Sequence, residues 1–311
     1  MGLRLGVVVN PTAGRGKAED KGRMASRLLA ARGHDVQDLT APDLATAATS
    51  AKQSVVDGVD AIVVAGGDGM THLGVNVVAG TTLPLGLIPM GTGNDFARLL
   101  GLPRHSVADA IGVIERALET GPRVVDAVQV SDNEHSMAEW FAGVLSAGFD
   151  AAVNAVANRL TWPRGESVYV RALFKELRRY QPYGFEVDID GVSVWENAAC
   201  LVAVGNGTFI GGGMKIAPNA LIDDGLLDVV IGGPLTKGQL LRVFPRVYKG
   251  SHISHPQVSV QRGRQVTIRP RPDLGPPPPD AHTDGERVGP LPLICTCVPG
   301  ALRVLAPALG Q

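Results

Sequence analysis

The sequence has few of the features that mark several large classes of protein. Its 311 residues include three cysteines and only 5% aromatic residues, and the formal net charge is −1. A nucleic-acid-binding protein usually carries a strongly basic surface, so a charge this close to zero argues against a nucleic-acid partner. No apolar run reaches the roughly 18 to 20 residues that a membrane-spanning helix needs. We therefore expect a soluble cytoplasmic protein that is free to visit a membrane surface.

The cysteines are too few for a disulfide framework. Cys295 and Cys297 lie two residues apart, which places both side chains on one face of a strand. No second Cys or His pair has metal-ligand spacing, and the two histidines of SHISH (251–255) have no acidic or cysteine ligand beside them. We expect the cysteines to be small buried residues in a reducing compartment.

The first 122 residues alternate between strand-like and helix-like segments. Apolar, β-branched runs occur at 4–10, 60–66 and 83–89. Segments with helical spacing or composition are 17–32, 44–56, 95–102 and 107–118. This alternation predicts βαβ units and an α/β domain with a mostly parallel sheet. In such sheets ligands bind at the carboxyl ends of the strands.

Residues 123–298 have a different texture. Short β-rich runs are separated by Gly, Pro and Asn turns, which predicts a second, largely antiparallel domain in the form of a β-sandwich. One helix is expected at 167–180. The last apolar run, within 299–311, suits a strand that packs on either domain, and completion of the first domain is one of these alternatives.

Three glycine-rich turns follow strands in the first domain. They are NPTAGRGK (10–17), GGDG (66–69) and GTGND (91–95). Glycine lets another group approach the backbone closely, and amides at a helix N-terminus bind anions. The first turn is not a Walker A loop, because Pro11 and Ala18 replace residues which that loop requires. Either acid, Asp68 or Asp95, would alone fit a helix N-cap. Together with three turns at one sheet edge, they predict phosphoryl transfer with Mg²⁺.

The segments NPTAGRGK, GGDGM and GTGNDFAR, in this order and spacing, resemble the diacylglycerol kinase catalytic domain. This family includes bacterial diacylglycerol kinases and the related sphingosine and ceramide kinases. In the second half, residues 202–231 resemble the family's second-domain signature, and TDGE (283–286) resembles its late acidic motif. The resemblance covers essentially the whole chain. It implies an NAD-kinase- or phosphofructokinase-like first domain and a lipid kinase that uses ATP and Mg²⁺ to convert diacylglycerol to phosphatidic acid.

The resemblance also implies roles for individual residues. The residues that would bind ATP are Asn10, Pro11, Thr12, Ala13, Gly14, Thr40, Gly66, Gly67, Asp68, Gly69, Met70, Thr71, His72 and Thr92. Asp68 and Asp95 would organise the catalytic Mg²⁺ through water molecules. A structural Mg²⁺ is implied on the carbonyls of Leu221 and Leu226 and the carboxylate of Asp224, an oxygen-only set that suits a hard cation.

Within TDGE, an acid would take the proton from the acceptor hydroxyl. The family pattern favours Glu286, with Asp284 as the alternative. Met70 departs from the threonine that is common in the family at this position. Its side chain cannot donate a hydrogen bond to a phosphate, a loss of about 1 kcal/mol.

Residues 159–183 combine arginines and lysines with aromatic side chains. Such a helix suits docking on an anionic bilayer, where each basic residue contributes about 1 kcal/mol. The alternative is an amphipathic helix that packs on the sandwich through Leu173, Phe174 and Leu177. We expect a lipid substrate met at the inner membrane face by peripheral association, and the sequence is compatible with a homodimer.

Two other functions fit parts of the sequence. NAD kinases share the GGDG motif, although GTGNDFAR and TDGE argue against a small-molecule kinase of that type. A non-catalytic lipid-binding regulatory protein with the same fold is the second alternative, and Met70 is the feature in its favour.

Overall fold

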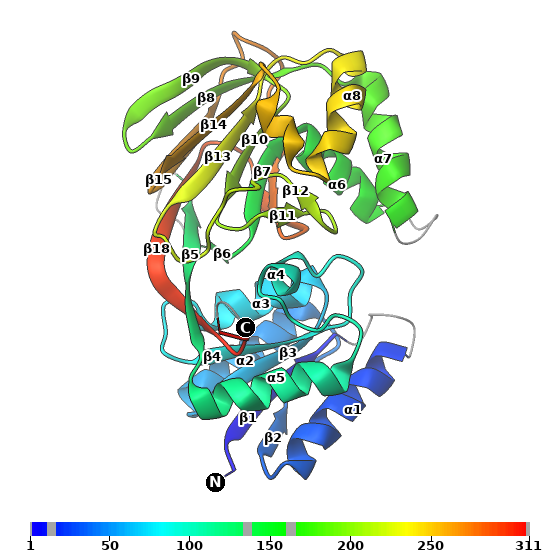
Figure 1. Ribbon diagram of the computed structural model, residues 1–311, viewed down its shortest axis with the longest axis vertical. Helices are drawn as coiled ribbons and strands as arrows, with labels where there is room; N and C mark the ends of the chain where they lie inside the picture. The colour runs from blue at the N-terminus through cyan, green and yellow to red at the C-terminus, as the bar shows by residue number, and fades with distance from the viewer. Residues whose placement is uncertain (1, 11–16, 133–138, 160–165, 309–311) are drawn as a thin grey trace. The chain divides into compact units, whose positions relative to one another are not determined.

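The chain forms two units in a computed structural model that describes residues 2–10, 17–132, 139–159 and 166–308 (Figure 1). The first unit is Met1–Ala127 together with Pro299–Gln311, and the second is Val128–Val298. Strands β5 (Arg123–Ser131) and β18 (Leu293–Val304) each run from one unit into the other. Among the described residues, no helix is long and apolar enough to cross a membrane.

The first unit is built on a parallel sheet. Its strands are β1 (Arg4–Val9), β2 (Asp35–Asp38), β3 (Ala61–Gly66) and β4 (Pro84–Pro89). They pair in parallel in the order β2-β1-β3-β4, and the last residues of β18 add in parallel beside β4. The predicted α/β domain with a mostly parallel sheet is therefore confirmed. Because these strands run in one direction, their carboxyl ends lie at the same edge.

Helices cover both faces of this sheet. They are α1 (Lys17–Ala31), α2 (Leu44–Val56), α3 (Asp68–Val78) and α5 (Val107–Thr120), while the short α4 (Asp95–Leu99) contacts α3. Helices α1 and α5 lie on one face, and α2 and α3 on the other (Figure 1). Met24, which the helical spacing places on the apolar side of α1, is 46% exposed, whereas Ala25 and Leu29 are buried.

The second unit is a sandwich of two antiparallel sheets. One sheet has the order β14-β13-β10-β7-β16-β17, and the other contains β18, β15, β8 and β9, with β5 beside β18 and β6 beside β5. The bounds are β6 (Glu139–Phe141), β7 (Val144–Gly148), β8 (Tyr183–Ile189), β9 (Val192–Ala199), β10 (Leu201–Gly205), β13 (Leu227–Gly232), β14 (Val258–Gly263), β15 (Gln265–Pro270), β16 (Ala281–Thr283) and β17 (Glu286–Gly289). A separate short pair is β11 (Phe209–Ile210) with β12 (Met214–Lys215). The predicted β-sandwich is confirmed.

Strand alternation explains how the sandwich core forms. Val202 and Val204 of β10 point into the core between the sheets, where Phe185 and Val187 of β8 meet them. The intervening Ala203 points to the opposite face of the sheet. Side chains alternate between faces because the strand period is two residues. Cys295 and Cys297 also lie buried in this core, as predicted, and burial raises the pKa of Cys295 to about 12.

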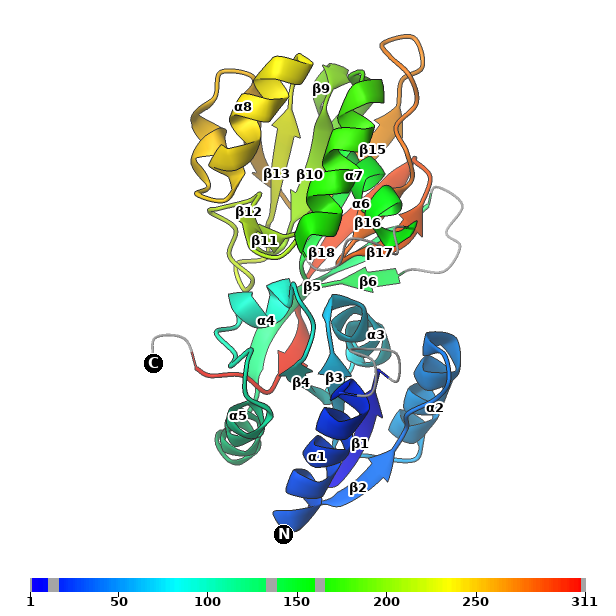
Figure 2. The same ribbon diagram turned by 90° about the vertical axis from the view of Figure 1, so that its right-hand side faces the viewer.

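Three helices cover the outer face of the six-stranded sheet, where the sequence predicted one. They are α6 (Phe149–Arg159), α7 (Glu166–Arg179) and α8 (Lys237–Val247), and they lie on the same side of the sheet (Figure 2). A short 3₁₀ helix, Ser251–Ser254, follows α8. Pro245 argues against a helix at this position, because proline disfavours helix interiors, and α8 was not predicted. The capping box of Thr236 and Gln239 is a sequence signal of its start.

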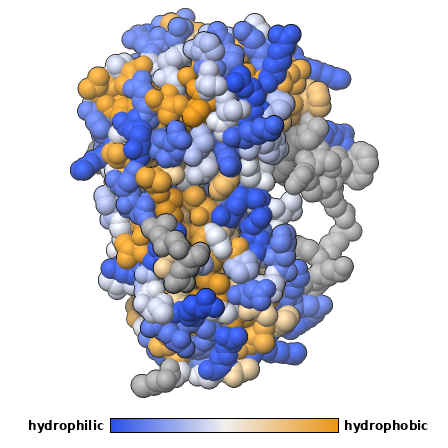
Figure 3. Space-filling model, viewed as in Figure 1, coloured by the Kyte–Doolittle hydropathy of each residue, from blue (hydrophilic) through white to orange (hydrophobic). Residues whose placement is uncertain are grey.

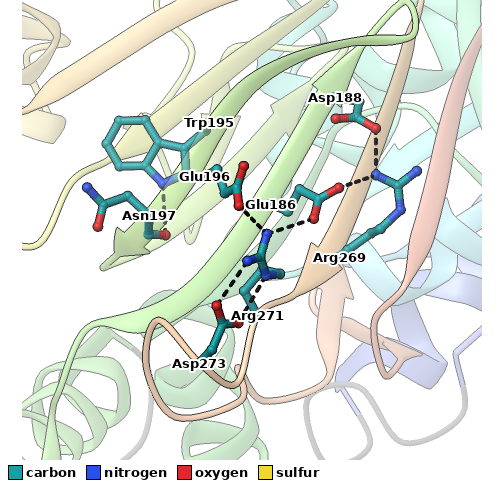
Figure 4. Close-up of polar contacts among 8 residues, drawn as sticks. All are labelled: Glu186, Asp188, Trp195, Glu196, Asn197, Arg269, Arg271 and Asp273. Carbon is teal, nitrogen blue, oxygen red and sulfur yellow. Dashed lines mark hydrogen bonds and ion pairs between the residues drawn. The ribbon is translucent and has the colours of Figure 1, made fainter.

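A network of ion pairs covers the outer side of β8, β9 and β15 (Figure 4). Glu186 lies opposite Glu196 across β8 and β9, an unfavourable pair of like charges. Arg271 donates to both acids and also to Asp273, while Arg269 donates to Glu186 at 2.9 Å. Exposed pairs of this kind each contribute about 0.2–1 kcal/mol. Arg271 therefore offsets the repulsion between Glu186 and Glu196 and helps β8 to pair with β9.

Candidate active site

Among the residues that the structure describes, the predicted nucleotide-binding residues of the first unit lie where β1, β3 and β4 end and in the loop after β2. The Asn10 amide donates to the Ala65 carbonyl at 3.1 Å, and the Met90 amide donates to the Gly66 carbonyl at 2.8 Å. The Thr40 hydroxyl accepts a hydrogen bond from the Val9 amide at 3.2 Å. These bonds hold the ends of three neighbouring strands and the loop after β2 at one edge of the sheet.

The GGDG and GTGND turns touch each other. A Cβ atom on Gly91 would lie 2.5 Å from the Gly67 Cα, which is closer than atoms can pack. A Cβ atom on Gly66 would lie 2.3 Å from the Met70 Cγ. Glycine is therefore required here partly for packing within the protein, because Gly67 and Gly91 lie against each other and Met70 lies against Gly66.

The Asp68 carboxylate joins the two turns. Its Oδ2 accepts a hydrogen bond from the Asn94 amide at 2.9 Å, and its Oδ1 accepts one from the Asp95 amide at 2.7 Å. Asn94 has φ of 50° and is 4% exposed, and its side chain bonds both backbone groups of Gly91. Asparagine tolerates this left-handed conformation better than most residues, so its place in GTGND was a readable signal that the sequence reading passed over.

The Asp68 carboxylate is partly buried. Burial raises the pKa of Asp68, and the hydrogen bonds from the Asp95 and Asn94 amides oppose that rise. The Asp95 Oδ1 lies 3.8 Å from the Arg98 Nε. Each Asp68 oxygen accepts one amide and keeps a second lone pair. This arrangement fits a Mg²⁺ that is held through its water ligands, a common mode for an ion that dehydrates reluctantly.

Met70, Thr71 and His72 have their side chains inside the first unit. Their exposed fractions are 1%, 8% and 9%, and all three belong to α3. The Met70 and Thr71 amides both donate to the Gly67 carbonyl at 3.1 Å. The side chains of these three residues therefore pack in the interior of the first unit, and the amides close the first turn of α3. The Met70 side chain, which stands where the family commonly has a threonine, is buried.

The remaining predicted ATP-binding residues are placed as follows. Thr92 is exposed in the turn between β4 and α4. Pro11, Thr12, Ala13 and Gly14 lie outside the described residues.

In the second unit, TDGE forms a two-residue hairpin. Thr283 of β16 pairs with Glu286 of β17, and the turn residues Asp284 and Gly285 have φ of 49° and 88°. Positive φ at both central positions is typical of a type I′ hairpin turn, for which Asp-Gly is a favoured sequence. The Asp284 carboxylate packs against Gly143, where a Cβ atom would lie 2.2 Å from its Oδ1. Asp284 thus shapes the turn, and the half-buried Glu286 is the acid at the start of β17.

Asn206 fixes the neighbouring backbone, a role that the sequence reading missed. It is fully buried, and its Nδ2 donates to the Ala142 carbonyl at 3.0 Å. Its amide donates to the Gly143 carbonyl at 3.0 Å. Asn206 therefore holds Gly143, the residue against which the Asp284 carboxylate packs.

The implied structural Mg²⁺ site has a different cation beside it. The Asp224 Oδ2 accepts a hydrogen bond from the Arg262 guanidinium, and its Oδ1 accepts one from the Leu226 amide at 3.0 Å. Arg262 also pairs with Asp228 at 3.1 Å. Leu221 is an exposed residue of the same loop. A guanidinium on the single carboxylate of the set repels a divalent cation, so these residues, as arranged here, do not fit the structural Mg²⁺.

Asp150 is a buried acid that the sequence reading did not single out. It lies in the first turn of α6 near Ser146 and His282, which face each other across β7 and β16. Among the described residues, neither carboxylate oxygen has a partner at normal hydrogen-bond geometry. Burial raises the pKa of Asp150, and Ser146 and the Ala151 amide offset the rise only in part.

We expect Arg262→Met to destabilise the second unit by about 1–3 kcal/mol. The change leaves the Asp228 carboxylate, whose side chain is 2% exposed, without its cation, and the figure allows for the 41% exposure of the Arg262 side chain. Thermal melting measures the effect, with Arg264→Met as the control. We also expect EDTA to leave the melting temperature of the wild type unchanged. A clear drop on chelation would contradict the assignment of the cation's place to Arg262.

We expect Asp150→Asn to raise the melting temperature at pH 7 to 8 and to have little effect near pH 4. Because burial raises the pKa in the folded state, the unfolded chain releases this proton first as pH rises above about 4, so the wild type loses stability over that range. The asparagine variant is free of this loss. Asp273→Asn is the opposite control, because Arg271 lowers the pKa of Asp273. A pH-independent effect of Asp150→Asn would contradict the expectation.

The geometry agrees with comparisons against known proteins. Residues 4–130 match the family model of the diacylglycerol kinase catalytic domain, and residues 143–306 match that of the YegS C-terminal NAD kinase beta sandwich-like domain. A diacylglycerol kinase of Mycobacterium tuberculosis is 35% identical over 307 residues, which cover 99% of this chain and 96% of the relative.

Solved structures show the same fold. A crystal structure of a diacylglycerol kinase from Bacillus anthracis has a TM-score of 0.70 at 22% identity, with 98% of this chain and 97% of that chain covered. An NAD kinase from Archaeoglobus fulgidus in complex with ATP has a TM-score of 0.51 at 14% identity, with 97% and 92% covered. Both family models and the extent of the mycobacterial match lead to one conclusion: the chain belongs to the diacylglycerol kinase catalytic domain family of lipid kinases.

Proposed function

We propose that the protein transfers the γ-phosphate of ATP, with Mg²⁺, to the hydroxyl of diacylglycerol and so forms phosphatidic acid. Its similarity to the mycobacterial diacylglycerol kinase over nearly the whole chain supports this substrate. The observation that carries the proposal is the junction of the GGDG and GTGND turns through Asp68. Because diacylglycerol is a membrane lipid, the enzyme would work as a peripheral protein at the inner membrane face.

The first unit would bind the nucleotide. Gly67, Asp68 and Gly69 stand at the N-terminus of α3, where backbone amides and the helix dipole favour phosphate oxygens. Asp68 and Asp95 would hold the Mg²⁺ through water molecules, and the ion, when bound, neutralises charge on the phosphates. The strand-end hydrogen bonds fix these groups before ATP arrives, which reduces the cost of ordering them during the reaction.

The second unit would supply the base. Glu286 would accept the proton of the acceptor hydroxyl as the oxygen attacks the γ-phosphorus, while the bond from that phosphorus to the leaving oxygen of ADP breaks. Asp284 serves the hairpin turn and so positions Glu286. A weak base suffices, because the transition state is loose and charge positioning does most of the work.

Labelled γ-phosphate decides between this function and its rivals. Purified protein with Mg²⁺ is given a panel of lipid hydroxyl acceptors, with NAD in a parallel reaction, and each product is identified by mass. We expect label in phosphatidic acid. Label in NADP would indicate an NAD kinase, which shares the fold. Lipid binding without any turnover would indicate a non-catalytic regulatory protein.

We expect Asp68→Ala and Glu286→Gln each to lower kcat by at least about 100-fold, the usual scale for removing an electrostatic group or a general base. Glu119→Gln, an exposed acid near the end of α5, is the matched control and should keep wild-type turnover. Far-UV circular dichroism checks that the variants fold. Near-wild-type rates in both site variants would remove these assignments.

A further inference from the structure

Helix α7 has an inner apolar side and an outer mixed side. Leu173 and Leu177 are buried against α6 and α8. Phe174 follows Leu173 directly and is 56% exposed, and Arg178 lies one turn further along the same outer side. More than half of the Phe174 side chain is therefore in contact with water and not with the core of its own unit.

Helix α8 repeats this division. Leu240 and Val243 are buried in the same cluster as Leu173. Lys237, Leu241 and Tyr248 are exposed. Their spacing of four and seven residues places them on one side of the helix, with Tyr248 directly after its last residue. Leu241 is 41% exposed and Tyr248 is 51% exposed.

The two outer sides meet at a groove. It has a volume of about 490 Å³ and is lined by Phe174, Leu177, Arg178 and Lys237. The Lys237 Nζ donates to the Arg178 carbonyl at 2.6 Å, so the first turn of α8 is tied to the last turn of α7. Figure 3 shows hydrophobic residues among hydrophilic ones over this corner of the second unit. The helices thus form one continuous surface.

The charge on this surface has one dominant sign. Helix α8 contains Lys237, Arg242 and Arg246 and no acidic residue. From residue 171 onward, α7 contains four basic residues and one acid, Glu176. The whole chain has a formal net charge of −1, so these two stretches are more basic than the chain as a whole. An anionic partner fits this field, whereas a second copy of the chain would bring like charges together.

We propose that Phe174, Arg178, Lys237, Leu241 and Tyr248 form a surface that docks the second unit on an anionic phospholipid bilayer. The proposal rests on the proposed function, which requires a substrate held in a membrane. The basic groups contact lipid phosphates, and the phenyl ring, the leucine and the tyrosine ring enter the interfacial layer.

Vesicle co-sedimentation without ATP tests the surface. Full-length protein is mixed with vesicles of phosphatidylcholine containing 30% phosphatidylglycerol, or of phosphatidylcholine alone (about 100 mM salt for both). We expect binding to the anionic vesicles only. The double variant Phe174→Ser/Arg178→Gln should weaken it at least about 10-fold, since each basic residue alone is worth about fivefold. Val56→Ser/Lys52→Gln is the matched control, because these exposed residues have the same spacing on α2.

The outcomes separate this surface from the catalytic proposal. Turnover of a short-chain diacylglycerol dispersed in detergent should be equal in the wild type and the double variant. Unchanged vesicle binding by the double variant, or equal binding to neutral vesicles, would overturn the docking surface while leaving the kinase reaction to its own assay. Sedimentation velocity tests the remaining alternative. A dimer that forms in the wild type and in the control variant, but not in the double variant, would assign the surface to a second copy of the chain and also overturn the proposal.

Discussion

The geometry of the candidate site depends on one carboxylate that accepts two backbone amides. Asp68 follows the end of β3, and its carboxylate accepts hydrogen bonds from the amides of Asn94 and Asp95, which follow β4. Hydrogen bonds to an ionised acceptor are stronger than neutral ones, and these two connect turns that lie 26 and 27 residues apart in the chain. The contact of Gly67 with Gly91 allows the turns to come close enough for these bonds.

This constraint explains why the acids and glycines occur together. A parallel sheet brings the ends of β1, β3 and β4 to one edge, but it does not by itself fix the loops that follow. The Asp68 bonds, the Asn94 side chain and the close glycine contact do so. The amides at the start of α3 and the remaining lone pairs of Asp68 are then held in place for phosphate and hydrated Mg²⁺, as the proposed function requires.

Features with a local signal could be predicted from the sequence. The alternation of apolar runs and helical spacing predicted the parallel sheet, and α2 has the predicted bounds of 44 and 56. Asp-Gly at 284–285 is a hairpin signal that accompanies the predicted acidic motif. Helix α6 and helix α8 were missed, since small residues and Pro245 weaken their helical pattern, but the capping box at Thr236 could have found the second.

Features that arise from tertiary contacts could not be predicted. Arg262 comes 38 residues after Asp224, and no spacing rule connects the two, so the sequence could not show that the Asp224 carboxylate also accepts a hydrogen bond from a guanidinium. Met70 is buried with its side chain packed against Gly66, a contact that the sequence does not reveal. The outer sides of α7 and α8 likewise form one surface only because both helices pack on the same sheet.

Hydrogen exchange at single amides tests the role of Asp68 most directly. In the wild type, the Asn94 and Asp95 amides should be protected, because both donate to the Asp68 carboxylate. In Asp68→Ala, those two amides should lose protection while the Val64 amide, inside β3, keeps its protection. Unchanged protection of Asn94 and Asp95 in the variant would contradict the claim that this carboxylate holds the two turns together.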